Sequence, residues 1–130
     1  MKKRINYSSG AVWEDKVGYS RAVRVGDLIE ISGTTSVEGD KVIGADDPYE
    51  QTKVIIEKFS SILKEAGGSL SDIVRVRIYV TNIDHWENIS KAYSEFFNKI
   101  KPAATMIEVG SLIAPELLVE MEATAMLNTD

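Results

Sequence analysis

The sequence predicts an α+β fold, in which one mixed sheet of about six strands carries two helices on one face. Two observations predict it. Residues 47–66 and 84–100 repeat apolar side chains at helical spacing, whereas several other segments alternate apolar and polar side chains as strands do. Two helices cover only one face of such a sheet, so the other face is predicted to be open. With 130 residues, the chain is expected to form a single domain over residues 1–130.

The first part of the chain predicts two hairpins. Residues 1–16 are polar and are predicted to be irregular. Two alternating runs within residues 17–35 meet at the Gly-Asp pair of residues 26–27, and such a pair favours a two-residue turn between strands. The Gly-Asp pair of residues 39–40 predicts a second, shorter hairpin.

Both helices have start and stop signals. Asp47, Pro48 and Glu50 occupy the positions of an N-cap, a first helical residue and a capping-box acid, and the glycines at 67–68 end this helix. The second helix is predicted to be capped at Asp84 and to end before Pro102.

The second half of the chain predicts three strands, over residues 72–81, 103–109 and 117–127. In the last strand Glu120 and Glu122 share one face, opposite an apolar set. Glu108 shares a face with Ala104 and Met106 in the strand before it. If these strands are neighbours, the three acids are expected to converge on one surface.

The open face of the sheet is predicted to mix charged, aromatic and apolar side chains. Alternation assigns to it Tyr19, Arg21, Leu28, Glu30, Ser32, Arg75, Arg77, Tyr79, Met106, Glu108, Leu118, Glu120 and Glu122. Two interpretations remain. The face packs against copies of the same chain, with ion pairs and a pocket at the seam. Alternatively, it is half-solvated and carries cross-strand Arg–Glu pairs.

Composition excludes several classes of function. A net charge of −5 argues against a nucleic acid as the main partner. The chain has no cysteine, which rules out disulfides and thiolate metal sites, and its single histidine, His85, favours no metal site. No apolar run approaches the roughly 20 residues of a membrane span, and no signal peptide is recognised. A cytoplasmic protein with no cofactor and no membrane partner is expected.

Glu120 is the candidate for acid–base chemistry. On a partly apolar surface near other carboxylates, its pKa is expected to be raised by burial and by like charge, which suits a group that activates water near neutral pH. The alternative is an ion pair with Arg75 or Arg77, which would lower the pKa of Glu120 instead.

Four blocks of the sequence together resemble one known family. They are GYSRAVRVGDLIEISGTT from Gly18, EAGGSLSDIVRVRIYVTNI from Glu65, AYSEFF from Ala92 and PAATMIEVGSLIAPELLVEMEA from Pro102. The chain resembles the YjgF/RidA family of reactive intermediate deaminases over most of its length. The resemblance implies a chorismate-mutase-like fold and a homotrimer, in which open sheet faces pack together and ligand clefts lie between subunits.

The resemblance also implies a reaction and a set of site residues. Family members hydrolyse enamine and imine intermediates to keto compounds and ammonia without a cofactor. The catalytic position corresponds to Glu120, and the substrate-binding positions that match the family are Tyr19, Ser32, Gly33 and Thr105. The family's carboxylate-binding Arg is replaced by Ala104, and its usual Cys by Met106.

The replacement of the Arg has consequences for specificity. A guanidinium–carboxylate pair contributes roughly 3–6 kcal/mol, so its loss weakens binding of a small 2-imino acid by about 10²–10⁴-fold. Arg21 is the nearest replacement, with Arg75 and Arg77 as others, and Ala104 and Met106 would widen the cleft. An imine or enamine hydrolase with altered specificity is therefore expected. The alternatives are a non-catalytic small-molecule-binding trimer and, less favoured by the charge, an endoribonuclease.

Overall fold

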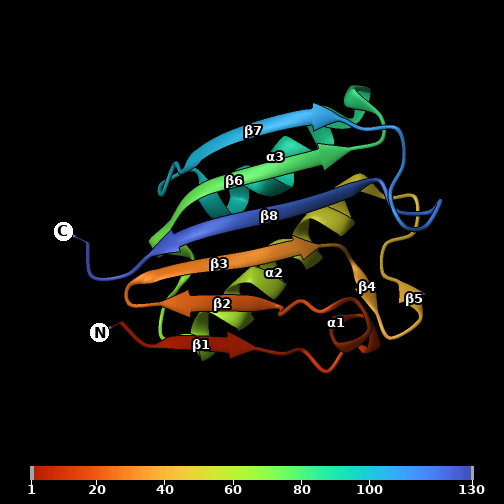
Figure 1. Ribbon diagram of the computed structural model, residues 1–130. Coiled ribbons are helices and arrows are strands. Elements are labelled where there is room, and N and C mark those ends of the chain that lie inside the picture. Colours follow the sequence, from red (N-terminus) through yellow and green to blue (C-terminus); the bar gives the residue numbers. More distant parts are fainter. Residues whose placement is uncertain (1, 130) are drawn as a thin grey trace.

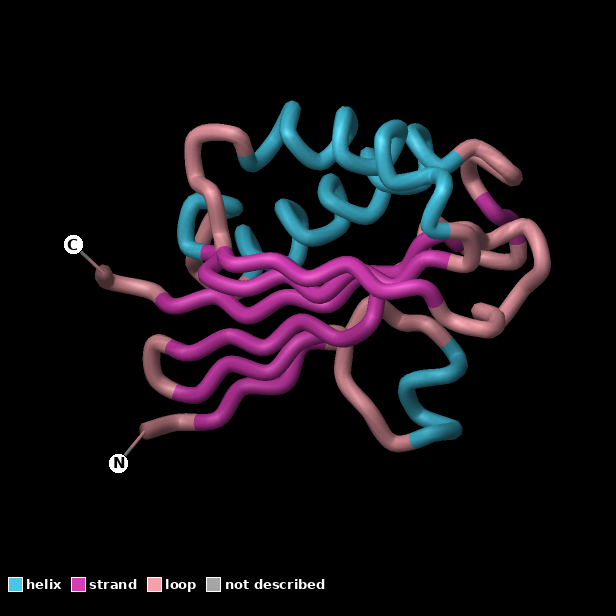
Figure 2. Tube along the Cα trace, turned by 90° about the horizontal axis from the view of Figure 1, so that it is seen from above, coloured by secondary structure: helices cyan, strands magenta, loops and turns pink. Residues whose placement is uncertain are grey.

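The computed structural model describes residues 2–129 as a six-stranded mixed sheet with two long helices on one face (Figures 1 and 2). The strand order is β1-β2-β3-β8-β6-β7. The strands are β1 (Arg4–Tyr7), β2 (Ala22–Val25), β3 (Leu28–Thr34), β6 (Ile73–Val80), β7 (Ala103–Glu108) and β8 (Val119–Met126). Only β6 and β7 run parallel, because α3 connects them. The predicted α+β fold is confirmed.

Both predicted hairpins are present. The turn between β2 and β3 contains Gly26 with a φ of 61°, in the left-handed region that favours glycine. A separate two-stranded sheet, β4 (Val37–Glu38) and β5 (Lys41–Val42), turns at Gly39, whose φ is 64°.

The two long helices begin differently. Helix α2 (Pro48–Glu65) starts as predicted, because the Asp47 side chain accepts hydrogen bonds from the backbone N–H groups of Tyr49 and Glu50. Helix α3 (Trp86–Phe97) is not capped by Asp84, so that prediction was wrong. Instead the Asn82 side chain caps a short 3₁₀ turn, Ile83–His85, which leads directly into α3. No helix within residues 2–129 is long and apolar enough to cross a membrane.

The hydrophobic core lies between the sheet and the two helices. Val119, Met121, Ala123 and Ala125 alternate along β8 with less than 3% exposure, while Glu120 and Glu122 point to the open face. The two-faced pattern predicted for this strand is confirmed. On β6 the alternation breaks at Val74, which is 47% exposed, because a register shift between residues 73 and 75 turns it outward.

The face assigned to Glu108 and Met106 was wrong. Strand β7 pairs in parallel with β6, and Met106 and Glu108 lie opposite Ile78 and Val80, which face the helices. Met106 packs against the core, and a Glu108 carboxylate oxygen accepts a hydrogen bond from the backbone N–H of Ile83 at 2.9 Å. Glu108 therefore does not join Glu120 and Glu122.

The N-terminal segment is more regular than predicted. Strand β1 pairs antiparallel with β2 at the edge of the sheet, with Arg4 opposite Val25 and Tyr7 opposite Ala22. A short helix, α1 (Val12–Val17), follows it and lies on the face opposite to α2 and α3 (Figure 2). This helix closes one side of the cavity that contains Glu120.

Candidate functional site

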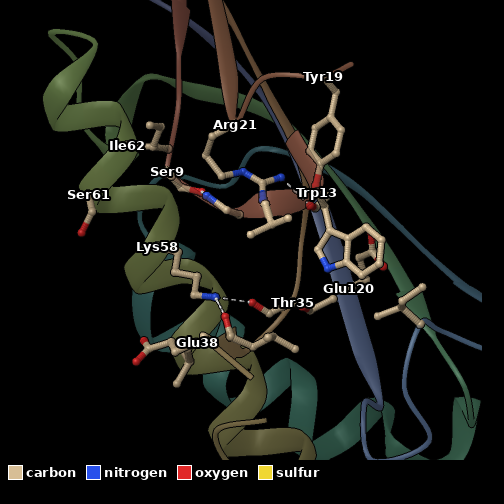
Figure 3. Close-up of a pocket in the computed structure, with 18 of the residues that line it drawn as sticks. Ser9, Trp13, Tyr19, Arg21, Thr35, Glu38, Lys58, Ser61, Ile62 and Glu120 are labelled. Carbon is tan, nitrogen blue, oxygen red and sulfur yellow. Dashed lines mark hydrogen bonds between the residues drawn. The ribbon is translucent and has the colours of Figure 1, made fainter. Parts of the chain in front are cut away.

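A cavity of about 1140 Å³ lies between α1, α2, the end of β3 and the start of β8 (Figure 3). Its wall combines aromatic, aliphatic and charged side chains. Lys58, on α2, lies on one side of the view, and Trp13, Tyr19 and Glu120 lie on the other. The cavity therefore gathers residues that are distant in the sequence around a single carboxylate of β8.

Glu120 is half-buried on the wall of this cavity. Burial raises the pKa of its carboxyl above the ordinary value, the Arg21 guanidinium opposes this shift, and the neighbouring Glu122 adds to it. The raised pKa agrees with the expectation of a buried carboxyl near like charge, and not with the alternative of an ion pair with Arg75 or Arg77. A carboxyl with a raised pKa exchanges protons more readily near neutral pH than an exposed one.

Gly33 allows the Glu120 carboxylate to approach the backbone of β3. A β-carbon on residue 33 would lie 2.2 Å from Glu120 Oε2 and 3.3 Å from its Cδ. The residue lies where the pairing of β3 with β8 shifts register between Ile31 and Thr34. Arg21 Nη2 donates to the carbonyl oxygen of Gly33 at 2.5 Å. Arg21, Gly33 and Glu120 thus form one contiguous group.

Tyr19 and Ser32 have different surroundings. Tyr19 lines the cavity, and the Arg21 guanidinium carbon lies 6.0 Å from the centre of its ring. Ser32 does not line the cavity; its hydroxyl donates to the carbonyl oxygen of Ser20 at 2.6 Å. This bond ties β3 to the residues before β2, next to Arg21.

Lys58 is a cavity residue that the sequence analysis missed. Its ammonium group donates to the carbonyl oxygens of Thr35 at 2.8 Å and Val37 at 2.5 Å. Burial lowers the pKa of Lys58, Glu38 partly opposes this shift, and Arg21 adds to it. A signal was present, because Lys58 stands four residues from Val54 and Ile62, at the border of the apolar stripe of α2.

The segment before β2 supplies the remaining wall of the cavity. Glu14 is 3% exposed and accepts hydrogen bonds from the Ser8 hydroxyl at 2.8 Å, the Ser9 N–H at 3.2 Å and the Ser9 hydroxyl. These bonds fold residues 8–14 into a compact loop. The adjacent Trp13 side chain, 63% exposed, is thereby held at the cavity.

Ala104, Thr105 and Met106 line a second, smaller cavity. Its volume is about 220 Å³, and the other residues around it are Ile78, Ser90 and Tyr93. Burial raises the pKa of Tyr93 to about 12, and its hydroxyl has no hydrogen-bond partner within residues 2–129. Within one chain, strand β6 separates this cavity from Glu120. The structure therefore brings together Tyr19, Arg21, Gly33 and Glu120, and holds the β7 residues apart.

The open face of the sheet carries two polar cross-strand contacts. The Tyr79 hydroxyl donates to Glu122 at 2.6 Å, and Arg75 Nη2 donates to the Thr105 hydroxyl at 2.7 Å. Glu122 is thus hydrogen-bonded to Tyr79 and does not line the cavity that contains Glu120. Across residues 2–129, no three His, Cys, Asp or Glu side chains are grouped so as to hold a metal ion.

Taken together, the half-covered sheet and the carboxylate cavity at its end define a class of small α+β proteins with a chorismate-mutase-like fold. The family model described as Endoribonuclease L-PSP matches residues 13–127. The chain belongs to this family, which also carries the names YjgF and RutC.

Relatives and solved structures agree with this assignment. A RutC family protein of Pyrococcus abyssi is 40% identical over 110 residues, 82% of this chain and 84% of the relative. A Mycobacterium tuberculosis member of the YjgF/YER057c/UK114 family is 43% identical, with a TM-score of 0.88 over 96% of this chain and 100% of that one. A Pseudomonas aeruginosa protein of unknown function is 30% identical, with a TM-score of 0.84 over 100% of this chain and 96% of that one.

Proposed function

We propose that this protein hydrolyses reactive imines, and enamines after their tautomerisation, to a carbonyl compound and ammonia. The observation that carries the proposal is the half-buried Glu120 carboxyl, which borders a large cavity and has a raised pKa. The family membership supports the same reaction class, because four residues of the cavity match or adjoin the family's site positions. They are Tyr19, Arg21, Gly33 and Glu120.

The reaction needs one water molecule and one group that moves protons. Glu120 takes a proton from water while the water oxygen forms a bond to the imine carbon. This proton passes to the nitrogen, which gives a carbinolamine. The hydroxyl proton of that intermediate is then taken up by Glu120 and passed to the nitrogen as the C–N bond breaks, so ammonia leaves and the carbonyl forms. Imine plus water gives carbonyl compound plus ammonia, so atoms and charge balance without a cofactor. A carboxyl whose pKa is raised by burial suits both proton transfers.

The specificity is proposed to differ from that of relatives with an Arg at the position of Ala104. Ala104 and Met106 carry no charge, so a small 2-imino acid loses the anchor that a guanidinium would provide. The cavity beside Glu120, about 1140 Å³, exceeds what a three-carbon substrate requires. The substrate is therefore larger, and it either lacks a carboxylate or binds that carboxylate to another cation of the chain.

The complete site is proposed to form between copies of the chain in a homotrimer. Hydrophobic side chains on the open face support such packing: Leu28 is 37% exposed and Ile107 is 47% exposed. In that assembly the small cavity of β7 in one copy lies beside the Glu120 cavity of another, which brings Ala104, Thr105 and Met106 to the substrate.

The test is an ammonia-release assay on imines of increasing size, generated in place from amino acids by a pyridoxal-phosphate enzyme or an oxidase. The wild type is expected to prefer bulky imines over 2-aminoacrylate, and Ala104→Arg is expected to gain activity on 2-aminoacrylate. An absence of ammonia release above the spontaneous rate on the whole series would contradict the proposal.

A second candidate is a small-molecule-binding trimer without catalytic activity, favoured by the uncharged Ala104. It would show ligand-induced thermal stabilisation and no turnover in the same series. The family's description names an endoribonuclease, but a net charge of −5 opposes binding of a phosphate backbone. RNA binding at physiological salt would favour that activity.

A further inference from the structure

Two cationic side chains line the Glu120 cavity and keep unused hydrogen-bond donors. A guanidinium has five N–H donors. Arg21 directs Nη2 to the Gly33 carbonyl, but its buried Nε has no hydrogen-bond partner within residues 2–129. A buried donor without a partner costs free energy, so such a group calls for an explanation, such as an ion bound to it or a catalytic role.

Lys58 is the second cation. Its ammonium group has three donors, and two of them are directed to the carbonyl oxygens of Thr35 and Val37. Burial lowers the pKa of Lys58 most, Glu38 raises it in part, and Arg21 is close enough to lower it further. Two half-buried cations therefore repel each other across one cavity, and an anion between them would remove that repulsion.

We propose that Arg21 and Lys58 form an anion-binding subsite for the carboxylate of the substrate, in place of the guanidinium that Ala104 does not provide. The inference rests on the proposed function and names its substrate class: 2-imino acids with a large apolar side chain. Arg21 contacts the backbone at Gly33, beside the Glu120 carboxylate, so a carboxylate held by Arg21 places the adjacent imine carbon near Glu120.

The other charged groups of the cavity do not cancel this subsite. Glu38, on β4, and Glu57 and Glu65, on α2, are exposed to solvent, where water and salt screen their charges. Glu14 also faces Arg21, but its oxygens are occupied by Ser8 and Ser9. The two half-buried cations thus share the cavity with one half-buried carboxylate, that of Glu120, while the exposed Glu38 offsets part of the charge of Lys58.

The remaining wall fits an apolar side chain on the substrate. Trp13 and Val17 of α1 are 63% and 70% exposed, and both line the cavity together with Ile62 and Ile113. Burying an aromatic ring against such a surface is favourable, and a phenyl ring has no polar group that needs a hydrogen-bond partner. A substrate with a carboxylate at one end and a phenyl-sized group at the other matches both the Arg21–Lys58 subsite and this apolar wall.

The test uses phenylpyruvate, the stable 2-oxo acid that such a reaction would release, and phenylacetone, which has a methyl group in place of the carboxylate. Isothermal titration calorimetry with the full chain is expected to show phenylpyruvate binding at least about tenfold tighter than phenylacetone. Lys58→Met is expected to weaken phenylpyruvate binding by about 10–100-fold, while leaving phenylacetone unchanged. Lys64→Met, an exposed lysine on the same helix and outside the cavity, is the matched control.

Lys58→Arg separates charge from packing, because it keeps the positive charge and should retain phenylpyruvate binding within about threefold. Equal binding of the two probes to the wild type would overturn the subsite, and this comparison does not depend on any variant folding. Unchanged phenylpyruvate binding by Lys58→Met would overturn it as well. Since the readout is binding, tight phenylpyruvate binding without ammonia release would contradict the proposed reaction and leave the subsite intact.

Discussion

The Glu120 carboxylate occupies the space that a side chain on residue 33 would need, since a β-carbon there would lie 2.2 Å from Glu120 Oε2. Glycine at 33 is therefore a steric requirement of the cavity, and not a requirement of backbone conformation, because its φ lies outside the left-handed region. The same residue offers its carbonyl oxygen to Arg21 at 2.5 Å, so it contacts both charged groups.

Gly33→Ala is expected to displace the Glu120 carboxylate and to lower the rate of imine hydrolysis by roughly 100-fold, because small misplacements of a reacting group have large effects on rate. Steady-state ammonia release measures this. Gly110→Ala is the control, since a β-carbon at residue 110 would meet no atom within 4 Å. Full activity of Gly33→Ala would show that the position of Glu120 over Gly33 is unimportant.

Glu120→Gln is expected to raise the thermal stability at neutral pH. Burial raises the folded-state pKa of Glu120 above 4.5. The folded wild type is therefore more stable while this carboxyl is protonated, and it loses that stability as the pH rises through the raised pKa. The difference in Tm between variant and wild type should be largest above pH 7 and should shrink below about pH 4.5. A difference that grows on acidification would mean that the carboxylate is stabilised as an anion.

Glu14→Gln is expected to loosen the loop that holds Trp13. Burial alone would raise the pKa of Glu14, but hydrogen bonds from Ser9 and Ser8 outweigh it and lower the pKa, so the charged form stabilises the fold above pH 4.5 and this stability is lost on acidification. Amide hydrogen exchange of residues 9–18 should become faster in the variant at pH 7. The exposed neighbour Asp15→Asn should leave it unchanged. Equal exchange in both would mean that Glu14 does not order this loop.

Ile107→Glu is expected to prevent assembly of the proposed homotrimer. Ile107 lies opposite Tyr79 in the β6–β7 pair, on the open face, and a carboxylate there would be buried between copies. Light scattering should give three times 14.4 kDa for the wild type and a smaller mass for the variant. Ile83→Glu, at an isoleucine 41% exposed outside the sheet, is the control. A wild-type mass of one chain would contradict the packing of the open faces.

The elements set by local rules were predictable from the sequence. The turn at Gly26, the cap at Asp47 and the alternation around Glu120 each follow from neighbouring residues. Strand β1 was missed because its pairing to β2 stabilises it, and α1 was missed because its order depends on side-chain hydrogen bonds from Ser8 and Ser9 to Glu14, which no periodic pattern reveals.

The candidate site was only partly predictable for a related reason. Alternation in β7 separates two sets of side chains but does not say which set faces the helices; the parallel pairing with β6 decides that, and it turns Met106 and Glu108 away from Glu120. Lys58 was missed because a lysine on an amphipathic helix is normally solvated. Its role depends on two loop carbonyls, of Thr35 and Val37, whose position no local pattern reveals.

The most direct test of the central claim is ammonia release from bulky imines by the wild type, Glu120→Gln and Glu122→Gln. Glu122 is a matched control, because it lies two residues further along the same face of β8 and is engaged by Tyr79 outside the cavity. Glu120→Gln is expected to lose at least about 100-fold in rate while Glu122→Gln stays near the wild type. Equal activity of wild type and Glu120→Gln would contradict the role assigned to this cavity.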